Sequence, residues 1–78
     1  MKEPRFKILD ICPLVARGEE PFSIIRARVD ALQAGEGLTV TAPFLPAPLI
    51  ELLKSEGFCA TPEWRAQGGW AVHFWRDS

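Results

Sequence analysis

Apolar and polar positions along the first half of the chain follow two different periods. In Arg5–Ile11 apolar residues partly alternate with polar ones, and the segment stops before a Cys-Pro pair, where proline cannot donate a ladder hydrogen bond. From Pro21 to Ala34-Gly35 apolar residues recur at steps of three and four, which is typical of an amphipathic helix ending at glycine. Gly37–Ala42 alternates strictly. The pattern predicts strand, helix and strand, with Pro13 to Glu20 as a connecting loop.

The second half begins with a break. Pro43–Pro48 contains three prolines, and Leu49–Glu56 then shows a short helical pattern that a glycine stops, which predicts a helix of about ten residues. Phe58–Ala66 and Gly69–Arg76 are the last two predicted strands, and the Gly-Gly pair between them suits a tight hairpin. Pro62 removes a ladder donor and therefore indicates an edge position or a bulge in the first of these strands.

The predicted order is β-α-β-α-β-β, so the fold class is α/β: a two-layer sandwich in which two helices lie on one face of a four-stranded mixed sheet. One sheet face is then left open. Alternation places the following residues towards the helices: Leu9, Ile11, Leu38, Val40, Trp70, Val72 and Phe74. It places these on the open face: Phe6, Ile8, Thr39, Thr41, His73 and Trp75.

Length and charge narrow the class of protein. Seventy-eight residues make one domain, 1–78, with a core small enough that a second chain covering apolar surface would be a reasonable supplement. Nine Lys plus Arg stand against ten Asp plus Glu, without a basic block, so nucleic acid is not an expected partner. Met1–Arg5 lacks the apolar run of a signal peptide, and no stretch is long enough to span a membrane. We therefore expect a cytoplasmic protein.

The residues able to do chemistry are few. The chain has two cysteines, Cys12 and Cys59, far apart in sequence, and one histidine, so spacing suggests neither a disulfide framework nor a metal site, and no cofactor motif is present. Cys12 ends a strand that lies near the start of the next helix, a position where a thiol could react; as the alternative, it is a small buried apolar residue. Cys59, beside an aromatic residue, is expected in the core.

Two groups of residues are candidates for binding. Glu19, Glu20 and Pro21 form a helix start, where acids are stabilising for dipole reasons alone but could also contact a partner. His73 and Trp75 lie on the open face and could serve as a ligand platform or become buried against another subunit. We expect a protein partner or a homodimer.

The order of elements and several short motifs resemble the TusA/SirA-like sulfur-carrier superfamily. The likeness is closest to its uncharacterised branch, a domain of unknown function without the carrier cysteine, and it covers nearly the whole chain. The matching residues are Leu9-Asp10, Glu20-Pro21, Leu32 followed by Gly35-Glu36 and Leu38-Val40, and Pro48-Leu49 through Glu56-Gly57-Phe58.

The resemblance implies a particular place for chemistry. In the carrier proteins a Cys-Pro-x-Pro motif opens the first helix, and its thiol carries sulfur as a persulfide; a helix N-terminus favours a thiolate. When the chain is aligned with that motif, Pro21 stands at the position of the second proline and Glu20 at the variable position. Glu19 then stands at the position of the first proline and Gly18 at that of the cysteine. The nucleophile of the family is therefore absent from this chain.

Two functional hypotheses follow. The first is a non-catalytic binding or regulatory module that contacts a protein partner, or itself, through the open sheet face. The second is a sulfur-transfer or redox protein in which Cys12 replaces the missing thiol as persulfide carrier. RNA binding, by analogy with the similar fold of the C-terminal domain of bacterial initiation factor three, is disfavoured by the acidic balance.

Overall fold

The structure, a computed structural model, describes residues 5–76 of the chain. Its elements follow the order β-α-α-β-α-β-β. They are β1 Arg5–Asp10, α1 Cys12–Ala16, α2 Phe22–Asp30, β2 Glu36–Ala42, α3 Ala47–Ser55, β3 Phe58–Trp64 and β4 Trp70–Arg76. The prediction that Met1–Arg5 begins no signal peptide falls largely on residues outside the described range.

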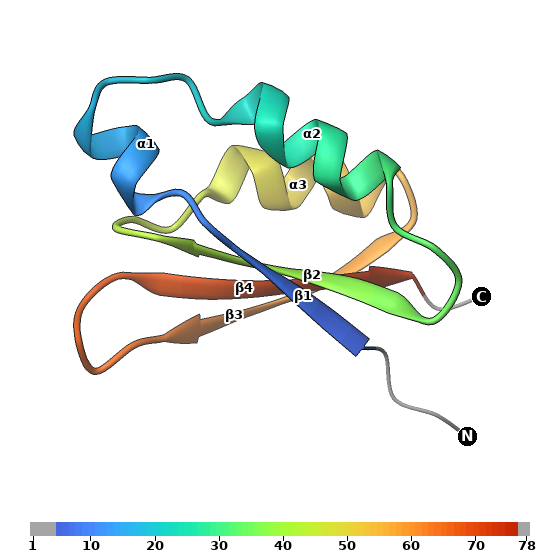
Figure 1. The fold of residues 1–78 in the computed structure, drawn as a ribbon. Helices are drawn as coiled ribbons and strands as arrows, with labels where there is room; N and C mark the ends of the chain where they lie inside the picture. The colour runs from blue at the N-terminus through green and yellow to red at the C-terminus, as the bar shows by residue number, and fades with distance from the viewer. Residues whose placement is uncertain (1–4, 77–78) are drawn as a thin grey trace.

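The four strands form one mixed sheet in the order β1-β2-β4-β3. β1 and β2 are parallel, whereas β2 with β4 and β3 with β4 are antiparallel. In Figure 1 the helices lie together above the sheet, and within residues 5–76 no helix covers its lower face. The predicted α/β class and four-stranded mixed sheet are confirmed, and the structure adds a third helix to the two that were predicted.

The added helix, α1, corrects the prediction of a loop from Pro13 to Glu20. The Asp10 side chain accepts a hydrogen bond from the Cys12 backbone N–H at 3.0 Å, which turns the chain directly after β1. Pro13 then occupies the first helical turn, where a missing N–H costs nothing, and Val15 N–H donates to the Ile11 carbonyl at 3.0 Å. A helix of five residues is too short to show a period in the sequence.

The next helix, α2, is shorter than predicted and covers Phe22–Asp30 rather than Pro21 to Ala34-Gly35. Ile25 and Val29 are the buried residues of its inner face. After the helix the chain turns back towards the sheet, and the Gly35 carbonyl accepts the Arg5 N–H at 2.8 Å. The glycine therefore joins the end of this turn to the sheet and does not end the helix.

The core lies between the sheet and the helices. Its most deeply buried members have relative exposures of 0–1% and are Ile11, Leu38, Val40, Leu53, Val72 and Phe74. Of the residues predicted to face the helices, all are buried except Trp70, which is half-buried. The Trp70 ring makes an edge-to-face contact with the Trp64 ring, with 5.5 Å between the ring centroids. Alternation along the strands thus predicted the inner face of the sheet correctly.

The C-terminal hairpin joins β3 to β4 through residues 65–69. Gly68 and Gly69 have φ of 98° and 87°, a conformation that side chains disfavour, and Arg65 N–H donates to the Gly69 carbonyl at 3.1 Å. The glycine turn is therefore confirmed, although β3 ends two residues earlier than predicted. Pro62 lies in an edge strand and pairs in register with Val72, as one of its two predicted alternatives requires.

Candidate functional site

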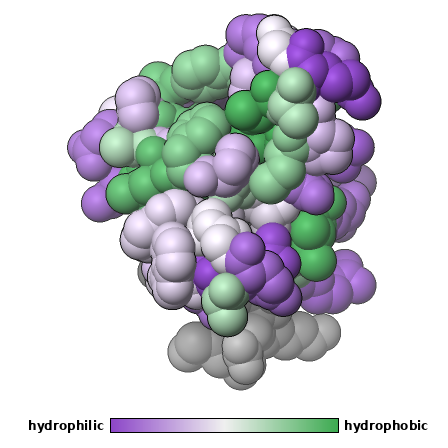
Figure 2. Space-filling view, turned by 90° about the vertical axis from the view of Figure 1, so that its left-hand side faces the viewer, coloured by the Kyte–Doolittle hydropathy of each residue, from purple (hydrophilic) through white to green (hydrophobic). Residues whose placement is uncertain are grey.

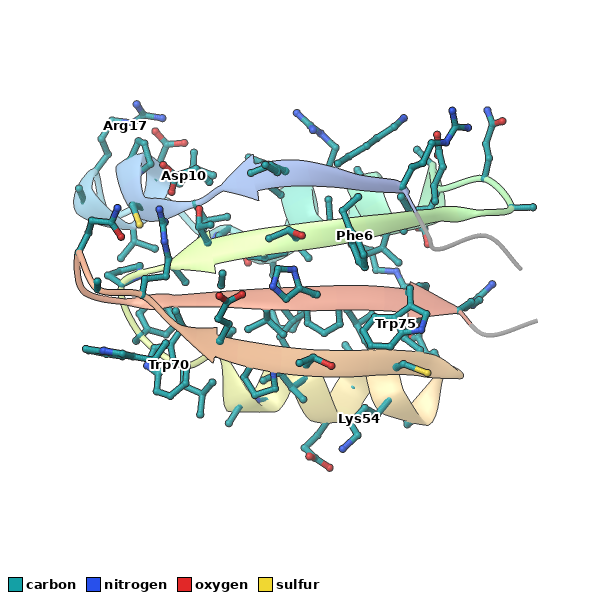
Figure 3. All side chains as sticks on the ribbon, turned by 90° about the horizontal axis from the view of Figure 1, so that it is seen from below. Phe6, Asp10, Arg17, Lys54, Trp70 and Trp75 are labelled. Carbon is teal, nitrogen blue, oxygen red and sulfur yellow. The ribbon has the colours of Figure 1, made fainter. Side chains whose placement is uncertain are left out.

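The open face of the sheet presents three rows of side chains. The strand registers place alternate residues of β1, β2, β4 and β3 side by side, and Figure 3 looks onto this face. The first row is Phe6, Gly37, Trp75 and Cys59; the second is Ile8, Thr39, His73 and Thr61; the third is Asp10, Thr41, Ala71 and Glu63. The face thus changes from aromatic at one end to acidic at the other.

The aromatic end is built around a glycine. The Phe6 ring lies over Gly37, where an added Cβ would come within 2.5 Å of the ring. It makes edge-to-face contacts with two rings: its centroid lies 5.5 Å from that of His73 and 6.1 Å from that of Trp75. In Figure 3 Phe6 and Trp75 lie at the same end of the sheet, on strands that β2 separates. The absence of a side chain at Gly37 therefore allows three rings from β1 and β4 to form one cluster.

The middle row contains the only histidine of the chain, and both of its ring nitrogens have partners. Nδ1 forms a hydrogen bond with Thr39 Oγ1 at 2.8 Å, and Nε2 forms one with Glu63 Oε1 at 2.9 Å. A hydroxyl, an imidazole and a carboxylate also make up the triad of hydrolases. Here, however, Thr39 is 7% exposed while the Glu63 side chain is 65% exposed, so the hydroxyl is out of reach of a substrate. The network can orient His73, but it does not present a nucleophile.

Cys12 lies next to the acidic row. Burial raises the pKa of its thiol, and the hydrogen bond to the Asp10 carboxylate with its negative charge raises it further. The Cys12 backbone N–H lowers the pKa of Asp10 in turn, so this carboxylate stays ionised. A thiol must lose its proton to attack or carry sulfur. This environment favours the protonated thiol and disfavours a thiolate.

At the start of α2 a carboxylate occupies the place where an anion would bind. Glu20 accepts hydrogen bonds from the backbone N–H of Phe22 and, at 3.3 Å, from that of Ser23, whose hydroxyl donates to the same carboxylate at 3.1 Å. Pro21 precedes the helix, and Glu19 pairs with Arg17 at 2.7 Å. Glu19 and Glu20 thus have separate partners and do not work as a pair, and Glu20 already accepts two of the free N–H groups at the helix end.

A small apolar groove lies beside this helix start, and the sequence did not predict it. Its volume is about 180 Å³, and its lining consists of apolar residues from the end of β1, the starts of α2 and α3, and the loop before α3. Phe22 and Phe44 line it while remaining 43% and 46% exposed. Figure 2 shows hydrophobic side chains gathered in the upper part of this end of the molecule. Most small-molecule sites are larger, roughly 300–1,000 Å³.

Residues 8–76 match the model of an uncharacterised conserved protein family, DUF2249. The chain belongs to this family. Comparison with curated proteins and with solved structures gives no significant match. The match spans all three helices, β2, β3 and β4, and β1 from Ile8 onwards, and it attaches no activity to the DUF2249 domain.

The DUF2249 domain brings only some of the predicted site residues together. His73 and Trp75 share the open face and are joined by Phe6 through ring contacts. The helix start at Glu19, Glu20 and Pro21 belongs to the helical layer on the other side of the sheet.

The positions of two further residues become clear only from the register of the strands. Cys59, expected in the core, is half-buried on the open face, in register with Trp75. The expectation failed because it followed the neighbouring Phe58, whose side chain points to the opposite, buried face. Glu63, which holds His73, was missed for the same reason: only the register of β3 and β4 shows that the two residues lie near each other.

Over residues 5–76 no helix is long and apolar enough to cross a bilayer. Nor do three or more His, Cys, Asp or Glu side chains gather there in a way that could hold a metal ion.

Proposed function

We propose that this domain is a non-catalytic binding module whose open sheet face contacts a protein partner. The main observation in support is the exposure of Ile8. This residue lies near the middle of β1 and is 70% exposed, and Phe6 on the same strand is 40% exposed. Both lie on a sheet face that no helix covers within residues 5–76. Apolar side chains clustered on an exposed face are typical of protein interfaces. Their position on strands also makes the surface rigid before a partner arrives.

The size of this face limits the kind of contact. Four strands at about 4.8 Å spacing and about seven residues at 3.3 Å rise give a face of roughly 19 by 23 Å. Its flat area, roughly 440 Å², is below the about 800 Å² per partner of a standard stable interface. We therefore propose a weak, reversible interaction of the kind common in regulation.

The polar residues support binding over catalysis. The Thr39 hydroxyl beside His73 is buried, and the Cys12 thiol is held in its protonated form by burial and by Asp10. The alternative in which Cys12 carries a persulfide needs an accessible thiolate, and this environment gives it no support.

We also infer a distant relationship with the TusA/SirA-like sulfur carriers. The order of the strands and main helices, and the start of α2 directly after Pro21, support it. In this chain Gly18 takes the place of the carrier cysteine, and the Glu20 carboxylate accepts the N–H groups that would stabilise a thiolate there. On this proposal the domain keeps the carrier scaffold and has exchanged sulfur chemistry for contact through the sheet.

Photo-cross-linking from two sides of the domain tests the binding proposal. Both natural cysteines are replaced by serine, and a cross-linker is attached at a new cysteine, Thr61→Cys on the open face or Lys54→Cys on α3. Both positions are exposed, and they lie on opposite sides of the sheet. In an extract of the cells that make the protein, the Thr61 position should give an adduct of discrete mass and the Lys54 position should not.

Competition then locates the contact. An excess of unlabelled wild-type chain should suppress the adduct, and a folded Trp75→Glu chain should not. Equal adducts from both positions, no adduct from Thr61, or full competition by Trp75→Glu would each contradict a contact through the open face. Circular dichroism of the Trp75→Glu chain shows whether its fold is retained.

A further inference from the structure

Within residues 5–76, the backbone groups along the outer edge of β1 have no hydrogen-bond partner at alternate positions. β1 is a border strand of the sheet, and its inner neighbour is β2. Arg5 N–H donates to Gly35 O at 2.8 Å and Ile11 N–H to Thr41 O at 2.9 Å, so the odd-numbered residues point their backbone groups towards β2. Because direction alternates along a strand, the N–H and C=O groups of Phe6, Ile8 and Asp10 point outwards.

The opposite border of the sheet is protected in a way that β1 is not. β3 contains Pro62, which lacks an N–H, and proline in an edge strand hinders pairing with another chain. β1 has no proline within Arg5–Asp10, and its central Ile8 is the most exposed of the large apolar residues in the described chain. An edge of this kind favours strand addition.

We propose that β1 pairs antiparallel with β1 of a second copy, so that two four-stranded sheets become one sheet of eight strands. The pairing places Ile8 opposite Ile8 on a two-fold axis, with each Phe6 opposite Asp10 of the other copy. All three outward residues of each strand then pair, and about six hydrogen bonds form, two for each opposed pair. The edge is self-complementary, which is what a two-fold contact between identical chains requires.

The neighbouring registers are poorer, which makes the pairing specific. With Phe6 opposite Ile8, only two of the three pairs remain, about four hydrogen bonds, and Lys7 comes to lie directly opposite Lys7 of the other copy. With Ile8 opposite Asp10, again only two pairs remain. The favoured register instead places Lys7 opposite Leu9, leaving its ammonium free for the ion pair with Glu36 at 3.5 Å.

A second copy is the occupant that also fits the surrounding surface. The two-fold axis keeps both helical layers on one side and joins the two open faces into one, with the two Ile8 side chains in contact at the junction. Paired strands of six residues bury less than the about 800 Å² per partner of a stable dimer, so the dimer is weak and forms at high concentration. The inference does not rest on the proposed function, because the backbone groups of β1 make the pairing, whereas the side chains of the open face make the proposed contact; Ile8 contributes to both.

Amide hydrogen exchange measured by NMR over a wide concentration range tests the pairing residue by residue. Exchange at Phe6, Ile8 and Asp10 should slow as concentration rises and the mass from light scattering increases. Lys7 and Leu9, whose N–H groups point to β2, are internal controls and should not change. Concentration-independent exchange at the three outward residues overturns the proposal, whether or not the mass rises.

Three variants separate the edge from the face. Ile8→Pro removes an outward N–H but no bond to β2, and it should leave the chain monomeric. Ile8→Val keeps the edge and should associate like the wild type. Trp75→Glu alters the open face two strands away; it removes a ring contact of Phe6 but no backbone group of β1, so it should also associate normally. Loss of association in Trp75→Glu with retention in Ile8→Pro would overturn pairing through the edge. A failed cross-linking test with intact edge pairing would instead count against the proposed function alone.

Discussion

The two faces of the same sheet have opposite surroundings, although the same strands build both. Towards the helices, Val40, Val72 and Phe74 have no exposed surface. On the other side, Ile8 and Phe6 remain 70% and 40% exposed. Burial of apolar area is the main stabilising term in folding, so side chains on the covered face determine stability. Apolar side chains left in water on the other face contribute little to folding and are free to contact another molecule.

The largest difference between the faces should appear when one apolar residue is truncated on each. Phe74→Ala on the covered face should cost about 3–5 kcal/mol, enough to unfold a domain of this size. Ile8→Ala on the open face should change the free energy of unfolding by less than about 0.5 kcal/mol. Urea unfolding followed by circular dichroism measures both. Similar costs at the two positions would remove the distinction between the faces.

A second substitution tests whether the open face has a built structure of its own. Gly37→Ala places a Cβ 2.5 Å from the Phe6 ring and 2.8 Å from the Phe74 carbonyl oxygen. We expect a loss of about 1–3 kcal/mol, because a central strand cannot move away freely. Adding Phe6→Ala should recover part of the loss, since it removes the ring but leaves the carbonyl contact. Thermal unfolding of the single and double variants checks this; full stability of Gly37→Ala would show that the ring is not held there.

The helix start should show a smaller effect. Glu20→Ala leaves the N–H groups of Phe22 and Ser23 without their carboxylate acceptor, and we expect about 1 kcal/mol of lost stability. Glu19→Ala is the matched control, because the Glu19 side chain pairs with the exposed Arg17 and accepts no N–H of the helix end within residues 5–76. Denaturant unfolding separates the two variants. Equal effects would mean that Glu20 has no special part in starting α2.

The smallest expected effect on stability at neutral pH comes from a substitution beside Cys12, and its main readout is the reactivity of the Cys12 thiol. Asp10→Asn removes the charge and the strong acceptor that raise the Cys12 pKa, so alkylation of Cys12 at neutral pH should become several times faster. Cys59 should keep its rate and serves as the internal control. Mass spectrometry of the labelled peptides reads both rates. An unchanged Cys12 rate would leave burial as the sole cause of the raised pKa.

The pH dependence of stability follows from the same pair. The pKa of Asp10 is lower in the folded chain than its ordinary value of 3.8. A lowered carboxyl pKa adds stability that is present above the unfolded value and is lost as pH falls through the folded value. Wild-type stability should therefore fall below about pH 4, and the Asp10→Asn chain should fall less steeply over the same range. Parallel acid curves for the two chains would contradict the assignment.

The sequence was sufficient for most of the fold because alternation and helical spacing are local signals. They predicted the inner residues Leu38, Val40, Val72 and Phe74 and the open positions of His73 and Trp75. The short helix α1 escaped because a side chain two residues upstream of Cys12 starts it, within a segment of proline, glycine and charge. The spacing of apolar and polar residues does not show a hydrogen bond between a side chain and the backbone such as this one.

The site was harder to predict because its contacts join different strands. The ring of Phe6 reaches His73 and Trp75 across β2, and Glu63 meets His73 only once the register of the hairpin is known. The apolar groove combines the end of β1 with two helix starts that are far apart in sequence. A single sequence indicates which residues share a strand face, but not which neighbouring strand lies beside them.

The most direct test of the open face as the contact surface is oxidative footprinting of tryptophans inside cells. Trp75 lies within the face, whereas Trp64 is 63% exposed at the end of β3 and alternates to the other side of the sheet. Compared with the purified chain at low concentration, oxidation of Trp75 in cells should fall and that of Trp64 should stay the same. Unchanged oxidation of Trp75, or protection of Trp64 in its place, would contradict the account.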